Sequence, residues 1–161
     1  MVAREQWRVR PRGVPGRRAG FYVIGVHPGR RLPPILSRAQ DPVLSWEHPE
    51  GEPWALVDRR TGTAYRAGVD TDFGTPHDVG YLGRLPRPDG NGSVLAIAGI
   101  HTAGSLGVVQ LRASDLNTLW GQVGEHRFST LVSVEYAPET DEPQTVELLT
   151  PLYRHDEETT A

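Results

Sequence analysis

The part of the chain best suited to chemistry is a pair of glycine-rich segments, each carrying a histidine and each continuing an apolar run. The first segment, Gly25–Arg31, reads GVHPGRR and follows the run Gly20–Val26. The second, Gly99–Gly107, reads GIHTAGSLG and follows the run Ser93–Gly99. Glycine lets a backbone approach a ligand closely, and the start of a helix offers unpaired N–H groups that attract anions. The pattern predicts where a ligand binds, but it does not identify a reaction.

The second segment is the better candidate, because it places several donors at a predicted helix start. His101, Thr102 and Ser105 lie where the helix dipole favours an anion. Gly99 and Gly104 permit either close approach of a ligand or tight packing of the helix on the sheet. His101 could bind a ligand or act as a general acid–base, and the alternative is a histidine that caps or packs at the turn. The segment has neither the lysine of a phosphate-binding P-loop nor the G-x-S-x-G pattern of a hydrolase.

The first segment predicts part of an anion site. Gly25 and Gly29 supply backbone freedom around His27, while Arg30 and Arg31 carry guanidinium groups suited to phosphate or carboxylate. The dinucleotide-binding pattern G-x-G-x-x-G is absent from it. The alternative interpretation is a Gly/Pro turn with solvated arginines.

A third candidate is Asp78, which follows His77 at the start of an apolar run. Its carboxylate could orient a histidine or hold a ribose hydroxyl, or it could simply begin a strand. In an enzyme, His101 and Asp78 would form the acid–base pair. Ser105 would complete the residue types of a serine hydrolase, but it shares one short segment with His101, whereas such triads usually draw on separate loops. Histidines and carboxylates show no spacing typical of a metal site, so none is predicted.

Composition narrows the function classes. The chain has 161 residues, a formal net charge of −3, 18 glycines, 14 prolines and no cysteine. Disulfides, thiol catalysis and cysteine–zinc sites are therefore excluded, and the absence of lysine excludes a Schiff base. The net charge gives no drive toward nucleic acid. Apolar runs are too short to span a bilayer and no secretory signal is present, so we expect a cytoplasmic protein without membrane contact.

We predict three regions: a disordered basic arm over residues 1–19, a single α/β domain over residues 20–154, and an acidic tail over residues 155–161. The arm is the one place where contact with nucleic acid is considered. The loop Gly68–Pro76 is acidic, with Asp70 and Asp72.

Strands and helices are predicted to alternate along the domain. Strands are expected at 20–26, 43–47, 54–58, 63–67, 78–85, 93–99, 128–136 and 144–153, and helices at 33–38, 102–112 and 116–123, the last capped by Ser114-Asp115. The three strands between residues 43 and 67 form an antiparallel meander, with Trp46 and Trp54 as packing residues. The pattern favours an α/β fold: a Rossmann-like sandwich with a mixed sheet and an inserted antiparallel meander. Both glycine-rich segments would lie at the ligand-binding edge of the sheet if their strands are parallel.

Four stretches carry a family resemblance. They are Asp41–Trp46 (DPVLSW), Asp58–Gly62 (DRRTG), Asp78–Gly80 (DVG) and Ala98–Gly104 (AGIHTAG). From about residue 20 to residue 153 the chain resembles an uncharacterised family of Rossmann-like domains common in actinobacteria. The resemblance implies a Rossmann-like fold and a nucleotide-linked sensing role. It directs attention to His101 and the two glycine-rich segments, but it supplies no established activity.

Three functions remain open. The first is a binding or sensor domain for a small anionic ligand, a nucleotide foremost. The second is a hydrolase or transferase that acts on a nucleotide through His101 and Asp78. The third is a protein-interaction module, in which the glycines only permit close packing. The sequence identifies neither a cofactor nor an oligomeric state.

Overall fold

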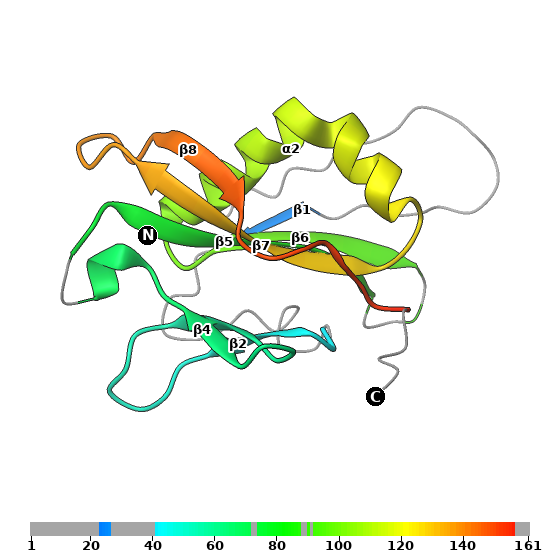
Figure 1. The fold of residues 1–161 in the computed structure, drawn as a ribbon, viewed down its shortest axis with the longest axis horizontal. Helices are drawn as coiled ribbons and strands as arrows, with labels where there is room; N and C mark the ends of the chain where they lie inside the picture. The colour runs from blue at the N-terminus through cyan, green and yellow to red at the C-terminus, as the bar shows by residue number, and fades with distance from the viewer. Residues whose placement is uncertain (1–22, 27–40, 72–73, 88–89, 91, 157–161) are drawn as a thin grey trace.

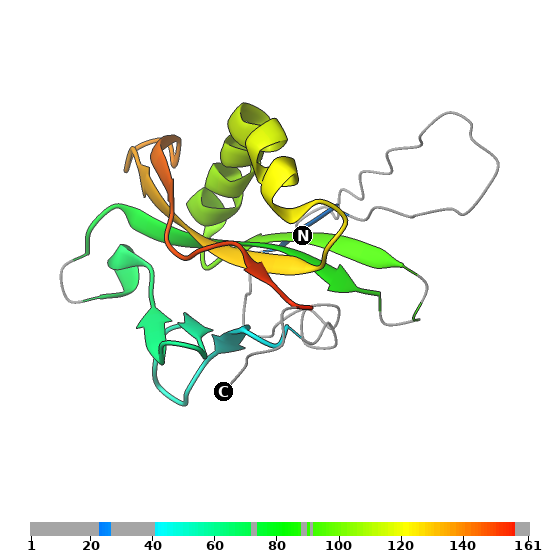
Figure 2. The ribbon, with the colours of Figure 1, turned by 45° about the vertical axis from the view of Figure 1, so that its right-hand side comes forward.

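The computed structural model describes residues 23–26, 41–71, 74–87, 90 and 92–156. These residues form three layers. A six-stranded sheet lies in the middle, the long helix α2 covers one face, and a separate three-stranded sheet covers the other (Figures 1 and 2). The predicted basic arm and the predicted helix at 33–38 lie outside the described residues.

The central sheet is largely antiparallel. Its strand order is β1-β6-β5-β7-β8, and β9 also pairs with β7. The strands are β1 Val23–Val26, β5 His77–Pro86, β6 Ser93–Gly99, β7 Phe128–Tyr136, β8 Pro143–Leu148 and β9 Tyr153–Arg154. Only β1 and β6 run parallel among these strands. The predicted Rossmann-like α/β sandwich is therefore wrong.

The error has a physical origin in β5 and β6. Both strands are almost entirely buried, which is typical of parallel strands between two helical layers. Here they form an antiparallel hairpin, in which Gly80 lies opposite Gly99 and Pro86 opposite Ser93. Their two faces are buried because α2 covers one and the three-stranded sheet covers the other (Figure 2).

Helix α2 spans Thr102–Val123 without interruption. We predicted two helices separated at Ser114-Asp115, and that division is wrong. The helix packs along β5, β6, β7 and β8 on both sides of this point, so tertiary packing outweighs the local preference of serine and aspartate for a cap. The predicted stop near Gly124 is correct: Gly124 has a φ of 54°, and its N–H donates to Trp120 O at 2.8 Å.

Two arginines from the sheet hold the C-terminal end of α2. The guanidinium of Arg154 donates to Gln122 O at 2.5 Å, and that of Arg84 approaches Gly124 O at 3.5 Å. A positive charge at this end complements the helix dipole.

The smaller sheet is the predicted meander. Its strands are β2 Leu44–Glu47, β3 Ala55–Asp58 and β4 Thr63–Tyr65, paired antiparallel in the order β2-β3-β4. Leu44 and Leu56 are buried against the central sheet, where they meet Tyr81 and Leu131. Trp46 and Trp54 pack at the edge of this core, as expected. The 3₁₀ helix η1, Gly68–Asp70, then leads back toward β5.

Two buried carboxylates fasten the smaller sheet to the central one. Tyr81 Oη donates to Asp41 Oδ2 at 2.8 Å, and Tyr153 Oη donates to Asp58 Oδ2 at 2.7 Å. Burial raises the pKa of Tyr81, and burial with the Asp58 hydrogen bond raises the pKa of Tyr153 to about 12. Both phenols therefore remain protonated donors at neutral pH.

The end of the described chain departs from the expected long edge strand. Instead, β8 and β9 both pair with β7, and Leu149 and Thr150 bridge them by backbone bonds to Leu131 O. Of the predicted acidic tail, His155 and Asp156 are described; the His155 side chain is buried, and Asp156 pairs with His126. Within the described residues, no helix is long and apolar enough to cross a membrane.

Candidate functional site

The candidate site lies where β1 and β6 end beside the start of α2. Val26 is opposite Ala98 in the parallel pair, so the carboxyl ends of the two strands are neighbours, as expected. Gly25 lies within β1, opposite Ile97. The other predicted residues of the first segment, His27, Gly29, Arg30 and Arg31, lie outside the described residues.

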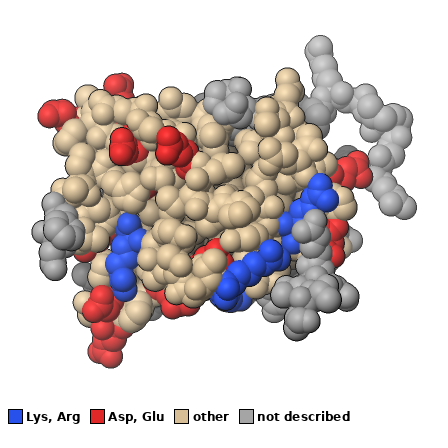
Figure 3. Space-filling view, viewed as in Figure 1, with Lys and Arg blue, Asp and Glu red and all other residues tan. Residues whose placement is uncertain are grey.

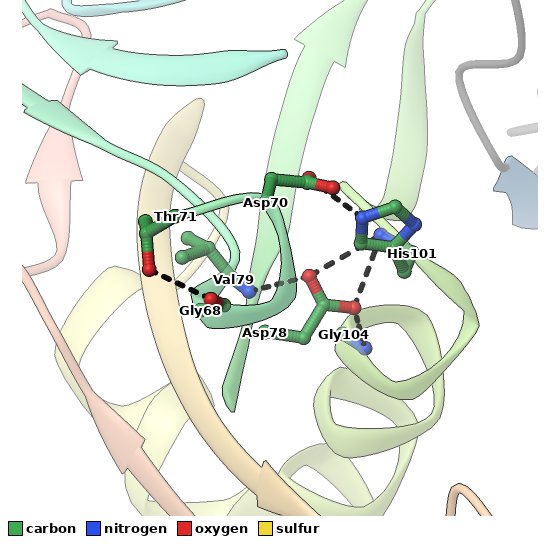
Figure 4. Close-up of polar contacts among 7 residues, drawn as sticks. All are labelled: Gly68, Asp70, Thr71, Asp78, Val79, His101 and Gly104. Carbon is green, nitrogen blue, oxygen red and sulfur yellow. Dashed lines mark hydrogen bonds and ion pairs between the residues drawn. The ribbon is translucent and has the colours of Figure 1, made fainter. Parts of the chain in front are cut away.

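His101 is the polar side chain at the centre of this edge. It is the N-cap residue of α2, with extended backbone, and its imidazole Nε2 lies 2.7 Å from Asp70 Oδ2 (Figure 4). The two side chains are 36% and 24% exposed. The carboxylate orients the ring, and a bond from one ring nitrogen to a carboxylate also sets which nitrogen carries the proton when the ring is neutral.

Asp70 belongs to η1, and sequence reasoning assigned it no role beyond an acidic loop. It precedes His101 by 31 residues, and the turn from the smaller sheet into β5 brings it to the ring. No spacing rule in the sequence could have paired these residues. The acidic character of the loop was the only available signal.

Asp78 lies at the start of β5, as the alternative interpretation of this residue expected. Its carboxylate is fully buried and accepts backbone N–H bonds from Gly104 at 2.6 Å, Val79 at 2.7 Å and His101 at 3.0 Å (Figure 4). It therefore caps α2 from a neighbouring strand and places negative charge at the positive end of the helix. The carboxylate that bonds the His101 ring is that of Asp70.

Burial raises the pKa of Asp78 above its usual value. The N–H bonds from Gly104 and Val79 and the nearby His101 oppose this effect without cancelling it. The folded protein thus holds a proton at Asp78 more tightly than the unfolded chain does. The N–H donors at the helix terminus offset part of the cost of burying this carboxylate.

The space beside the glycines of the second segment is occupied by closely packed neighbouring atoms. A Cβ on Gly104 would lie 2.6 Å from Val79 O, and one on Gly99 would lie 2.3 Å from His101 O. A Cβ on Gly80, in the facing strand, would lie 2.6 Å from Gly104 O. The first turn of α2 therefore rests directly on the backbone of β5 and β6. This is the packing role that the sequence left open as an alternative to ligand approach.

Three polar side chains of the second segment face outward to different degrees. Thr102 is exposed, while Ser105 and His101 are half-buried. With Asp70 they give this edge one exposed hydroxyl, one half-buried hydroxyl and an oriented imidazole. Among the described residues, no group of three or more His, Asp or Glu side chains could hold a metal ion.

A second histidine cluster, which sequence reasoning missed, lies between the two sheets. His155 Nε2 is 2.8 Å from Ser129 Oγ and 3.5 Å from Asp41 Oδ1. A catalytic triad presents the serine and the acid to opposite ring nitrogens, but here both approach the same one. Ser129 is also fully buried, so we assign this cluster to structure.

Comparisons with protein-family models, with curated proteins and with solved structures found no match. The function is therefore argued from the geometry of the site.

Proposed function

We propose that the protein is a cytoplasmic binding or sensor domain for a small anionic ligand, with nucleotides as the first class to test. The observation that carries the proposal is the oriented, half-exposed imidazole of His101. It lies at the carboxyl ends of the parallel pair β1 and β6, where open sheets commonly receive ligands, and at the positive end of α2.

The donors available to the proposed anion differ from those that the sequence suggested. We expected backbone N–H groups around Gly99–Gly107 to hold phosphate, but those of His101 and Gly104 are engaged by Asp78. Side chains would therefore take a larger share of the recognition, with Thr102 and Ser105 as hydroxyl donors and His101 as a ring N–H donor. Arg30 and Arg31 follow β1 closely in sequence, and we include them in the proposal as phosphate-binding candidates.

The surroundings of Asp78 favour a binding role over the alternative in which His101 and Asp78 perform acid–base catalysis. Asp78 is buried beneath the helix terminus, and its oxygens accept three backbone N–H groups. A group held in this way secures the helix rather than exchanging protons with a substrate.

A second candidate is the protein-interaction module. The packing at Gly80, Gly99 and Gly104 favours it, because close contact of α2 with the sheet explains these glycines without a ligand. The same helix exposes Leu106 and Val109, at 45% and 51%.

A thermal-shift screen separates the two candidates. The wild-type protein is melted with mono-, di- and cyclic nucleotides, sugar phosphates and inorganic phosphate. Ligand at about 100 times its Kd stabilises the folded state by roughly 2.7 kcal/mol. We expect one nucleotide class to raise the Tm of the wild type and of His77→Gln, a control whose side chain bonds Ser133, but not of His101→Ala. No shift across the panel would contradict the proposal and favour the interaction module. Turnover of a stabilising nucleotide would instead favour the enzyme.

A further inference from the structure

His155 fastens the end of the described chain over the joint between the two sheets. Its ring contacts Ser129 of β7, in the central sheet, and Asp41, which directly precedes the smaller sheet. The side chains of His155 and Asp41 are 6% and 7% exposed. One imidazole therefore touches both sheets in a setting that excludes most water.

Asp41 links His155 to the start of β2 by hydrogen bonds. Its Oδ1, the atom nearest to His155, accepts the backbone N–H groups of Val43 and Leu44 at 2.8 and 2.9 Å. Its Oδ2 accepts the hydroxyl of Tyr81 from β5. A change in the charge of His155 would therefore act directly on the hydrogen bonds that place β2.

Four charged groups act on the ring of His155. Asp41 and Asp156 favour a protonated ring, whereas Arg127, before β7, and Arg60, in the turn between β3 and β4, oppose it. Figure 3 shows arginine side chains crossing the lower right of the molecule, the side on which β9 lies in Figure 1. Burial adds the largest opposition, so the pKa of His155 is lowered from 6.5.

The hydrogen bond to Ser129 also depends on the state of the ring. A neutral imidazole can accept the serine proton at Nε2, but an imidazolium has no lone pair there and must donate. Ser129 is fully buried, so its hydroxyl hydrogen would then need another acceptor inside the joint. Protonation is thus opposed by geometry as well as by burial.

We propose that His155 is a proton-sensitive latch: the neutral ring holds the C-terminal residues and β2 closed on the central sheet, and protonation in the mildly acidic range releases them. The unlatched segment comprises residues 153–156 and the start of β2. This inference does not depend on ligand binding at His101.

Hydrogen exchange at pH 7.5 and pH 5.5, corrected for intrinsic rates, tests the latch. Because the closed ring binds a proton less tightly than the open ring, whose ordinary pKa is 6.5, opening rises between pH 7.5 and pH 5.5, by up to about tenfold. We expect this rise in wild-type β2 and residues 153–156, with β6 unchanged. His155→Gln removes the titration and should remove the rise.

His77→Gln is the matched control, because His77 Nε2 also bonds a serine, Ser133 Oγ, at 3.0 Å on the same strand β7. It should retain the wild-type response. An equal rise in wild type and His155→Gln, or no rise in wild type, would overturn the latch. If His155→Gln fails to fold, NMR titration of the wild type decides: the His155 ring and the Leu44 amide should shift with one midpoint, and titration of the ring without any change at Leu44 would refute the proposal.

Discussion

Two of the histidine–aspartate contacts in the described part of the protein look alike as a list of residues and differ in their surroundings. His101 meets Asp70 at 2.7 Å on a half-exposed edge, beside a helix start. His155 meets Asp41 at 3.5 Å and Ser129 at 2.8 Å inside the joint between two sheets. Residue type alone does not distinguish a histidine that binds a ligand from one that stabilises the fold. Exposure and the identity of the bonded partners do, and on these grounds we propose ligand recognition at His101 and a structural role for His155.

A similar contrast exists within α2, between glycines that touch the sheet and one that does not. Gly104→Val should have the largest effect, destabilising the fold by about 3 kcal/mol, because its Cβ would lie 2.6 Å from Val79 O. Gly121→Ala, on the same helix with no atom within 4 Å of the added Cβ, should stabilise by up to about 1 kcal/mol. Denaturant unfolding of both variants measures the difference. Equal effects would show that the first turn is not tightly packed.

The two aspartates near His101 should also behave differently. Asp78→Ala leaves buried N–H groups without an acceptor and should destabilise by about 2 kcal/mol. Asp70→Ala removes a partly exposed ion pair and should change stability by less than about 1 kcal/mol. Chemical denaturation at pH 7 checks both values, and a larger loss for Asp70 would reverse the roles assigned here.

Replacing each histidine tests the main comparison directly. His155→Ala should destabilise by about 1.5 kcal/mol, because it leaves Ser129 without its partner in the joint. His101→Ala should cost less than about 1 kcal/mol, since its pair is partly solvated. The two changes should also be additive within about 0.5 kcal/mol, because the clusters share no residue. Strong coupling in the double mutant would show that the two ends form one network.

A further, pH-dependent effect concerns Tyr153, whose hydroxyl bonds Asp58. Its folded pKa of about 12 lies above the ordinary value of 10. The folded state therefore binds this proton more tightly, so the stabilisation is complete below pH 10 and is lost as pH rises through 12. Tyr153→Phe should lose about 1 kcal/mol at pH 8 and show a shallower fall in stability above pH 10. Identical alkaline profiles for the two proteins would contradict this role.

Local patterns predicted much of the fold but not its class. The meander, the strand Ser93–Gly99, the helix start near His101 and its stop at Gly124 follow from alternation, apolar runs and glycine positions. The Rossmann-like class failed because burial on both faces of a strand does not say whether a helix or a second sheet covers it. Only the tertiary arrangement decides that.

The candidate site was predicted in part. The segment around His101 was found because glycines and donors are adjacent in sequence. Asp70 and the contacts of His155 were not found, since each depends on segments far apart in the chain. Asp78 was found as a residue of interest, but its bonds to the backbone of His101 and Gly104 beneath the helix were not predicted.

The most direct test of the account is an NMR titration that follows backbone amides and histidine rings while each nucleotide class is added. We predict saturable shifts at His101, Thr102 and Ser105, with the His155 ring unchanged. Shifts confined to another surface, or no response at His101 to any ligand in the panel, would contradict recognition at this edge.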